Sequence, residues 1–345
     1  MDASEPLLTS SPKNHPPVAY GRVGVLLINL GTPEALTNSA VRTYLAEFLS
    51  DRRVVDYPAA LWQPILRGII LNTRPSKTCA AYAKIWDQET DESPLRRYTR
   101  EQSAGVANRL PDDIHVDWAM RYGTPSVASR LDAMKELGCD RILLVPLYPQ
   151  YSATTTGTAC DAAYRWALQQ PWQPALRTVP AFHDDEATIE ALANLCRENV
   201  HEDTERVIIS FHGLPQRYFE NGDPYHCHCQ KTARLMREAL GWDTDFAPTA
   251  FQSKFGPEKW LEPSTESLVI KAAEDGLKKI AVVTPGFVSD CIETLEEVGI
   301  GLAETFEEHG GETLTAIPCL NARADFLDAL SAIIKRELAG WVSFP

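Results

Sequence analysis

Short apolar runs alternate with amphipathic stretches along most of the chain. The runs are rich in β-branched residues and leucine and mostly lack period-two alternation, which is typical of strands buried on both faces. We expect such strands at residues 23–30, 114–120, 141–147, 206–211 and 279–283. Helical spacing between them predicts helices at 39–49, 126–137, 231–240 and 266–276, and a last one at 325–338. This alternation predicts parallel βαβ units and an α/β fold.

Two pairs of similar segments indicate that the chain contains two related halves. Residues 28–33 resemble residues 210–215, and residues 138–146 resemble residues 276–285, in the same order along the chain. In the second pair a helix closes at glycine and a strand follows. Leu30 and His212 then occupy matching positions at the tips of their strands. A cleft between such halves suits a large, flat, mostly apolar ligand with a polar centre.

The length of 345 residues favours two domains over one. We place the change from the first half to the second near residues 165–180, where prolines at 171 and 174 interrupt regular structure. The expected division is a first domain at 20–168 and a second at 169–322. The C-terminal helix, at 323–345, is expected to pack on either domain, and the polar segment 1–19 to be a disordered tail.

Charge and composition exclude several classes of protein. A net charge of −14 argues against nucleic-acid binding and against general adhesion to anionic lipid. No signal peptide and no run long enough to span a membrane is present. The eight cysteines are scattered, which favours reduced thiols or metal ligands in a cytoplasmic protein. The usual nucleotide-binding loops and the nucleophile elbow are also absent from the sequence.

A histidine and a row of acids fall where two expected strands end. His212 closes the run at 206–211, and Asp290, Glu293 and Glu297 follow the run at 279–283. Ligands of open α/β sheets bind outside the carboxyl ends of the strands. If a helix starts near residue 291, Glu293 and Glu297 share one face and repel, so a cation or a proton should compensate them. The alternatives are a satisfied core histidine and an acidic first helical turn that suits the helix dipole.

Residues 226–229 form a dense group of potential metal ligands with the sequence His-Cys-His-Cys. Four such side chains in a row suggest zinc or an iron–sulfur cluster. Neighbouring residues cannot all reach one metal, however, so Cys160 is the candidate for a further thiolate beside Cys227 and Cys229. The alternative, which we favour, is a group of solvated loop residues before a helix.

Many short stretches, taken together, resemble the ferrochelatase family. They run in order from about residue 23 to 300 and lie at residues 27–33, 48–51, 93–94, 121–123, 148–157, 210–215, 222–225, 251–261 and 287–297. The resemblance implies two Rossmann-like domains, each with a parallel four-stranded sheet, and a porphyrin cleft between them. It also implies a lyase that inserts Fe(II) into protoporphyrin IX to give haem, at the last step of haem synthesis.

The resemblance also implies roles for individual residues. His212 matches the family's active-site histidine and Glu293 its partner glutamate, which jointly bind ferrous iron and remove pyrrole protons. Asp290 and Glu297 would extend the acids into a path for iron or protons. The residues that would line the porphyrin pocket are Leu30, Arg121, Tyr122 and Tyr151. Residues 59–66 match an apolar lip at the pocket mouth, which allows peripheral contact with the inner membrane.

The chain departs from some family members at the positions of a [2Fe–2S] cluster. No cysteine follows Cys319, and Ala153 stands where animal enzymes place a cluster cysteine. Cys160, Cys227 and Cys229 are the remaining candidates, and no fourth ligand is evident. Three alternatives to the protoporphyrin reaction stay open: iron insertion into coproporphyrin, cobalt insertion into a corrin precursor, and a tetrapyrrole or metal carrier without catalysis.

Overall fold

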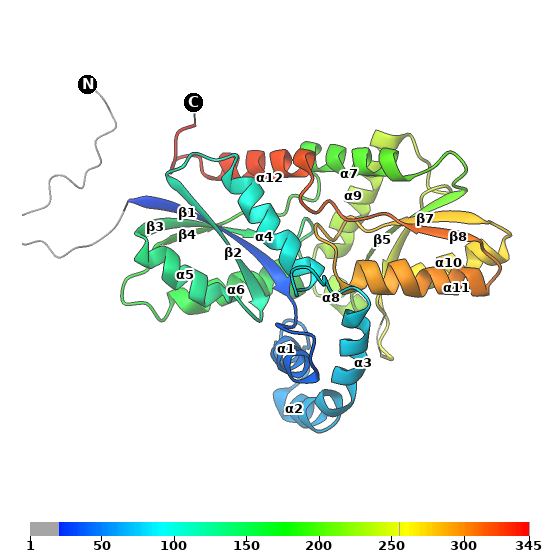
Figure 1. Ribbon diagram of the computed structural model, residues 1–345, viewed down its shortest axis with the longest axis horizontal. Helices are drawn as coiled ribbons and strands as arrows, with labels where there is room; N and C mark the ends of the chain where they lie inside the picture. Colours follow the sequence, from blue (N-terminus) through cyan, green and yellow to red (C-terminus); the bar gives the residue numbers. More distant parts are fainter. Residues whose placement is uncertain (1–20, 255, 345) are drawn as a thin grey trace, which may run out of the picture.

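Two parallel four-stranded sheets form the framework of the computed structural model, which describes residues 21–254 and 256–344 (Figure 1). The segment 1–19, expected to be a disordered tail, lies outside the described residues. The first sheet has the order β2-β1-β3-β4 and the second β6-β5-β7-β8. Their bounds are β1 Arg22–Gly31, β2 Ile114–Tyr122, β3 Cys139–Pro146, β4 Ala175–Thr178, β5 Arg206–His212, β6 Thr249–Gln252, β7 Lys279–Val283 and β8 Thr313–Ala316. The prediction of an α/β protein with two four-stranded parallel sheets is confirmed.

Helices cover both faces of each sheet. The first sheet lies between α5 (Val127–Glu136) with α6 (Thr158–Ala167) and α4 (Pro94–Ala107) with α12 (Ala324–Glu337). The second lies between α10 (Thr265–Glu274) with the π-helix η4 (Glu293–Leu302) and α11 (Ala303–Glu308), and α7 (Glu186–Asn199) with α9 (Tyr225–Leu240). In β1, Leu26 and Ile28 pack on one side and Val25 and Leu27 on the other, because successive side chains alternate between faces. Burial on both faces explains the unbroken apolar runs.

The matching positions of Leu30 and His212 are confirmed by strand register. Gly24 of β1 pairs with Ile142, and Arg206 of β5 pairs with Ile280, the equivalent position of the second sheet. Leu30 and His212 each lie six residues further along these first strands. The two sheets also share one order of strands. This agreement supports the interpretation of the chain as two related halves.

The expected boundary at 168/169 is too early. Strand β4 lies beyond that boundary, yet it pairs with β3 and completes the first sheet. The chain changes sheets after Thr178, through α7. Its prolines at 171 and 174 mark a loop within the first half rather than a linker between domains.

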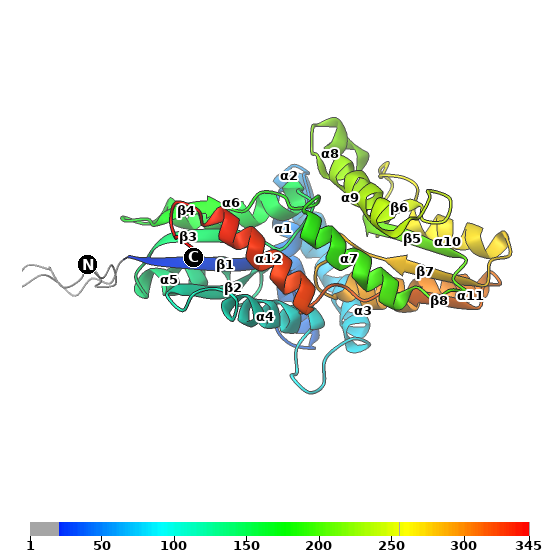
Figure 2. The same cartoon turned by 90° about the horizontal axis from the view of Figure 1, so that it is seen from above.

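The last helix packs on both halves. Asp328 of α12 forms an ion pair with Arg109, just after α4, at 2.6 Å. Arg323, the N-cap residue of α12, pairs with Glu198 of α7 at 2.6 Å. Figure 2 shows α12 and α7 side by side above the sheets. The apolar residues of this layer belong to one cluster with both sheets, so α12 stabilises the junction of the halves.

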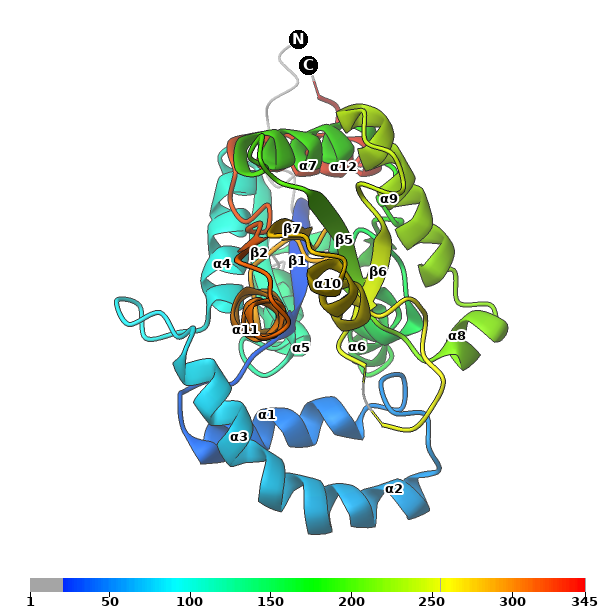
Figure 3. The same cartoon turned by 90° about the vertical axis from the view of Figure 1, so that its right-hand side faces the viewer.

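A helical lobe projects beyond the carboxyl end of β1 (Figure 3). It consists of α1 (Asn38–Ser50), α2 (Ala59–Ile65), the π-helix η2 (Leu66–Ile70) and α3 (Leu71–Ala83). Leu45, Leu66 and Leu71 form its small core, which packs against Tyr122 at the end of β2. The expected lip at 59–66 falls on α2 and the start of η2. None of the helices within residues 21–254 and 256–344 combines the length and apolarity needed to cross a bilayer.

The start of helix α9 corrects one expectation. The two helices not yet named are η3 (Ala153–Gly157), a π-helical turn, and α8 (Gln216–Glu220). Helix α9 begins at Tyr225, so residues 226–229 lie in its first turns and not in a loop before it. The apolar spacing over 231–240 missed this start because the first turn of α9 contains histidine and cysteine in place of a regular apolar stripe.

Candidate active site

A cavity of about 860 Å³ opens where the lobe faces the carboxyl ends of both sheets. Its volume lies in the range of small-molecule sites. The lining is largely apolar and comes from β1, the α1–α3 lobe, the loops after β3 and β5, and the start of η4. Leu30 and His212, the two matched strand tips, both line it, as do Glu293, Glu296 and Glu297. The structure thus brings together the histidine and glutamates singled out from the sequence.

His212 is held at the tip of β5 by its backbone and by one ring nitrogen. Its Nδ1 lies 2.6 Å from the carbonyl oxygen of Gly213, and Tyr225 donates its hydroxyl hydrogen to the His212 carbonyl at 3.0 Å. A carbonyl can only accept, so Nδ1 carries the hydrogen and Nε2 keeps a lone pair for a metal or a proton. A side chain at Gly213 would approach the Gln252 carbonyl to 2.6 Å, which explains the glycine after the histidine.

The acids lie on the wall formed by η4. Both oxygens of Glu297 are bound by Ser253, from its N–H at 2.8 Å and its hydroxyl at 2.6 Å. Ser253 has φ +62°, a conformation that residues other than glycine rarely adopt. Burial raises the pKa of Glu297 and the charge of Glu293 adds to this, while the bonds from Ser253 and the charge of His212 act against it. His212, Glu293 and Glu297 therefore form one electrostatic group.

Two lobe tyrosines face this group. Burial raises the pKa of the Tyr82 phenol, and the charge of Glu293 raises it further. The pKa of Tyr44 is raised by burial, by Tyr82 and by Glu293. Both tyrosines line the cavity. They remain neutral hydrogen-bonding groups next to Glu293.

Asp290 does not extend the acidic row into the cavity, contrary to expectation. It is buried, and it is not among the residues that line the cavity. One oxygen accepts from Asn321 Nδ2 at 2.7 Å, and the other accepts from the Thr294 hydroxyl at 2.9 Å and the Cys319 N–H at 3.2 Å. These three bonds hold both oxygens of its carboxylate, so Asp290 supports the start of η4.

Arg121 and Tyr122 are also absent from the cavity lining. The Arg121 side chain, which is 10% exposed, pairs with Asp51 at 2.5 Å, and the Tyr122 hydroxyl donates to the same carboxylate at 3.0 Å. Burial would raise the pKa of Asp51, but hydrogen bonds from Thr158 and the Arg53 N–H, with the charge of Arg121, lower it. Arg121 and Tyr122 thus support the end of α1, and their expected contact with porphyrin stays a prediction.

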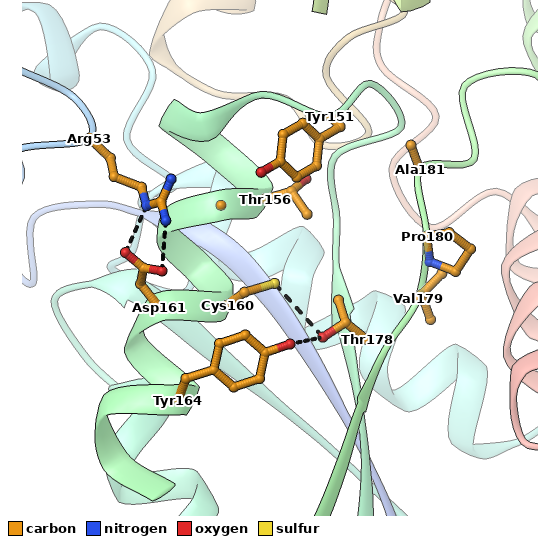
Figure 4. Close-up of a pocket in the computed structure, with 11 residues that line it drawn as sticks. Arg53, Tyr151, Thr156, Cys160, Asp161, Tyr164, Thr178, Val179, Pro180 and Ala181 are labelled. Atoms are coloured by element: carbon orange, nitrogen blue, oxygen red, sulfur yellow. Dashed lines mark hydrogen bonds and ion pairs between the residues drawn. The ribbon is translucent and has the colours of Figure 1, made fainter. Parts of the chain in front are cut away.

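Tyr151 lines a second, smaller pocket of about 340 Å³ together with Cys160 (Figure 4). This pocket lies against η3 and α6, and Arg53 and Asp161 form an ion pair at its edge at 2.7 Å. Thr154 and Thr155 of η3 line the large cavity, whereas Thr156 and Gly157 line the small one. The η3 turn thus separates Tyr151 from the main site.

The candidate cysteines do not form a cluster site. Cys227 is exposed, Cys229 is fully buried, and two positions along a helix point about 200° apart. The thiol of Cys160 contacts Thr178 at 3.8 Å in the smaller pocket. Over the described ranges, no three His, Cys, Asp or Glu side chains are arranged to hold a metal ion. Burial raises the pKa of Cys160 and of Cys229, so both thiols are protonated in the absence of a metal.

Several aromatic residues line the cavity, and the sequence singled out only those in the matching stretches 48–51 and 148–157 and in the expected lip 59–66. The lobe supplies Tyr44, Phe48, Trp62 and Tyr82, and the loop after β3 supplies Tyr148. The Tyr148 hydroxyl is buried without a hydrogen-bond partner in the described structure. Arg74 and Lys77 of α3 and Arg217 of α8 add positive charge to the lining. The aromatic content of α1 was a usable signal, whereas the basic side chains of α3 lacked any pattern that set them apart.

Comparisons with known proteins identify the family. A model of the ferrochelatase family matches residues 22–338. The ferrochelatase of Rhizobium johnstonii is 55% identical over 336 residues, covering 96% of this chain and 98% of the relative. That of Agrobacterium fabrum is 54% identical over 340 residues, covering 97% and 99%.

Solved structures agree at the level of the fold. SirB from Bacillus subtilis with Fe³⁺ has a TM-score of 0.55 at 11% identity, over 92% of this chain and 96% of that one. The sirohydrochlorin chelatase SirB from Bacillus subtilis subspecies spizizenii, in complex with cobalt, has a TM-score of 0.54 at 9% identity, over 92% and 95%.

The paired sheets and the cleft between them define a two-domain chelatase fold. Within that class the chain belongs to the ferrochelatase family, and it is an enzyme, a porphyrin metal chelatase of the lyase class.

Proposed function

We propose that His212 and Glu293 together deliver the metal and remove the pyrrole protons in the reaction of this family, the insertion of ferrous iron into protoporphyrin at the last step of haem synthesis. The observation that supports these roles is the meeting of an imidazole and a carboxylate in one large apolar cavity. Ferrous iron accepts both ligand types, and neither holds it too tightly for transfer.

The chemistry requires a site that releases one cation and accepts two protons. The lone pair on Nε2 of His212 can bind iron or take a pyrrole proton. Glu293 supplies a carboxylate oxygen in the same cavity, and Glu297, whose pKa is raised by burial, can accept a proton closer to neutral pH than an ordinary glutamate. Glu297 is therefore our choice for the exit of protons along η4, with Asp290 acting only as a support.

Substitution at the two residues tests this assignment. His212→Ala and Glu293→Gln should each lower anaerobic haem formation from Fe(II) and protoporphyrin by about 10²–10⁴-fold, the usual worth of a proton-transfer group. His309→Ala and Glu308→Gln change the same residue types at exposed positions near the end of α11 and serve as controls. Normal turnover in both site variants would contradict the assignment.

Protoporphyrin is favoured over coproporphyrin by the apolar lining. Coproporphyrin carries four propionates and protoporphyrin two, so the former would place two more charges against apolar wall. Arg74 and Lys77 on α3, with Arg217, offer cationic partners for the two propionates of protoporphyrin. We expect a higher kcat/KM for protoporphyrin than for coproporphyrin. The reverse order, or faster insertion of Co(II) into a corrin precursor, would overturn this preference.

We further propose that the lobe contacts a membrane surface. Leu61, Ile65 and Ile69 on α2 and η2 are 66%, 45% and 60% exposed, beside the cavity residues Trp62 and Ile70. Exposed apolar side chains at the mouth of an apolar cavity would let a hydrophobic porphyrin pass directly from lipid. The net charge of −14 makes apolar insertion the main source of affinity.

Vesicle binding tests this contact. Leu61→Ser and Ile69→Ser should each weaken sedimentation with phosphatidylcholine–phosphatidylglycerol vesicles by roughly fivefold. Leu168→Ser is the matched control, because Leu168 is 85% exposed just after α6, away from the lobe. Equal binding of all three variants and the unmodified protein would contradict the proposed surface.

A further inference from the structure

A buried glutamine connects the first half of the molecule to the acidic wall of the second. Gln102 of α4 is fully buried, and its amide makes three bonds to loops near the start of η4. Its Nε2 donates to the Val288 carbonyl at 3.2 Å and the Asn321 carbonyl at 2.9 Å, and its Oε1 accepts from the Ser289 hydroxyl at 3.2 Å. Val288 and Ser289 line the active-site cavity, whereas Gln102 does not.

The loops that Gln102 binds are the same loops that hold Asp290. Asn321 donates its N–H to Val288 at 2.8 Å and accepts the Asp290 N–H at 2.9 Å, while its amide nitrogen binds the Asp290 carboxylate. Asn321 has φ +49°, a conformation that costs energy for a residue other than glycine and persists when its surroundings fix it. Asp290 in turn accepts from Thr294, the residue after Glu293.

Other bonds also hold η4. No side chain caps the helix at Ile292, but the Glu293 carbonyl accepts from Gln252 Nε2 at 3.1 Å, and Ser253 binds the Glu297 carboxylate. The buried chain Gln102–Asn321–Asp290–Thr294 connects the residue after Glu293 to the first half. A buried network of this kind is rigid when every member is satisfied and loses its geometry when one donor is removed.

We propose that Gln102 is a positioning residue, which acts across the two halves to hold Glu293 at the distance from His212 that metal delivery requires. This proposal rests on the proposed function of Glu293. Gln102 touches neither substrate, so its loss should affect the metal step more than porphyrin binding.

Gln102→Met tests the proposal, because methionine keeps the length of the side chain but cannot donate a hydrogen bond. With Zn(II) as a redox-stable probe metal, we expect the KM for metal to rise about tenfold and kcat to fall about tenfold, while the KM for porphyrin stays within twofold. Ser103→Ala is the matched control, since Ser103 is buried at the next position of α4 and is outside this network. An unchanged KM for metal in Gln102→Met would overturn the proposal.

A double variant separates positioning from a general loss of structure. If Gln102 acts through Glu293, adding Gln102→Met to Glu293→Gln should not weaken Zn(II) binding further in a titration. Additive losses would overturn the proposal.

A second variant serves if Gln102→Met does not fold. Ser289→Ala removes only one bond of the network, so its KM for metal should rise about threefold, and an unchanged KM would contradict the proposal. Wild-type activity of Glu293→Gln would instead refute the proposed function itself.

Discussion

Arg121 shows how a residue can resemble a ligand contact and serve a structural purpose. Its guanidinium ends on Asp51, which also accepts from Tyr122 and Thr158. This buried pair ties the end of α1 to the end of β2 and the start of α6, and the loop after α1 leads to the cavity residues Val54 and Val55. Arg121 therefore acts on the cavity through the loop that Asp51 anchors.

Replacing Arg121 by methionine tests this structural purpose. Removing one partner of a buried ion pair leaves the other charge unpaired, so Arg121→Met should lower the free energy of unfolding by about 3 kcal/mol. The folded fraction should bind protoporphyrin almost normally, because no bond to the ligand is lost. Denaturant unfolding and fluorescence titration measure the two effects. A large loss of porphyrin affinity at unchanged stability would restore Arg121 as a ligand contact.

The sequence identified residues whose place is set by strand ends, and it failed where side-chain direction decides. His212 and Leu30 lie at strand tips, Glu293 and Glu297 lie on the helix that follows β7, and all four reach the cavity. Arg121 also lies near a strand end, but its side chain turns to Asp51. The direction of such a side chain depends on its partners from distant segments, and the spacing of residues along the chain does not reveal these partners.

At the scale of elements, α9 meets the crossover segment between the halves through a stack of two histidines. The rings of His183 and His228 lie parallel at 3.7 Å between centroids, and His228 Nδ1 accepts the N–H of Tyr151 at 3.2 Å. Burial and the nearby His228 lower the pKa of His183 to about 4, with Lys231 acting in the same direction and Asp184 against it. Burial also lowers the pKa of His228. The stack is therefore stable only while both rings are neutral.

Acidification should weaken this contact between elements. The unfolded chain binds a proton at position 183 near pH 6.5, and the folded chain does so only near pH 4. Between these values the unfolded state holds more protons, so stability falls as pH falls. His183→Phe keeps a stacking ring and should flatten the decline of the unfolding temperature from pH 6.5 to 4. The two proteins should show the same trend above pH 7, and parallel curves at low pH would contradict the argument.

Periodicity predicted the longer strands and helices such as α1 and α12, but it did not single out the 14-residue helices α4 and α7 or the short strands. Strands β4, β6 and β8 have four residues each, too few for a period to emerge. The acidic segment was expected to form an α-helix with Glu293 and Glu297 on one face, but η4 is a π-helix. Its wider turn still brings both glutamates to the cavity. Asp290 and Ser253, which lie outside the helix, bond to Thr294 and Glu297 within it, and such contacts cannot be read from periodicity.

For the whole molecule, the related halves explain why one side of the site is apolar and the other polar. Equivalent strand tips bring Leu30 and His212 to one cavity, and the halves differ most in the segment after the first strand. In the first half the chain enters the α1–α3 lobe, and in the second it enters α8 and α9. The two pairs of similar segments predicted that the halves are related, but they held no information about how the lobe covers the cavity.

Contacts between the lobe and the second half cross the mouth of the cavity. Lys84, at the end of α3, pairs with Glu296 of η4 at 2.8 Å. On the other side Tyr57 donates to Glu258 at 2.5 Å, and Arg217 pairs with Asp56 at 3.2 Å. We expect a flat ligand as large as a porphyrin to separate these groups as it enters or leaves. Lid opening of this kind often limits turnover.

Lys84→Met should therefore speed exchange of the ligand without a cost in stability. Exposed ion pairs contribute little to folding, so the unfolding temperature should stay the same. The rate of protoporphyrin dissociation in stopped-flow fluorescence should rise about threefold to tenfold, and kcat should rise with it if product release limits turnover. Added salt should produce part of the same effect in the unmodified protein, because the pair is exposed to solvent.

The control is Lys254→Met, which removes a similar exposed pair, with Glu262, inside the second half. This variant should leave the dissociation rate unchanged. Equal rates for Lys84→Met and Lys254→Met would show that the lobe opens independently of this ion pair.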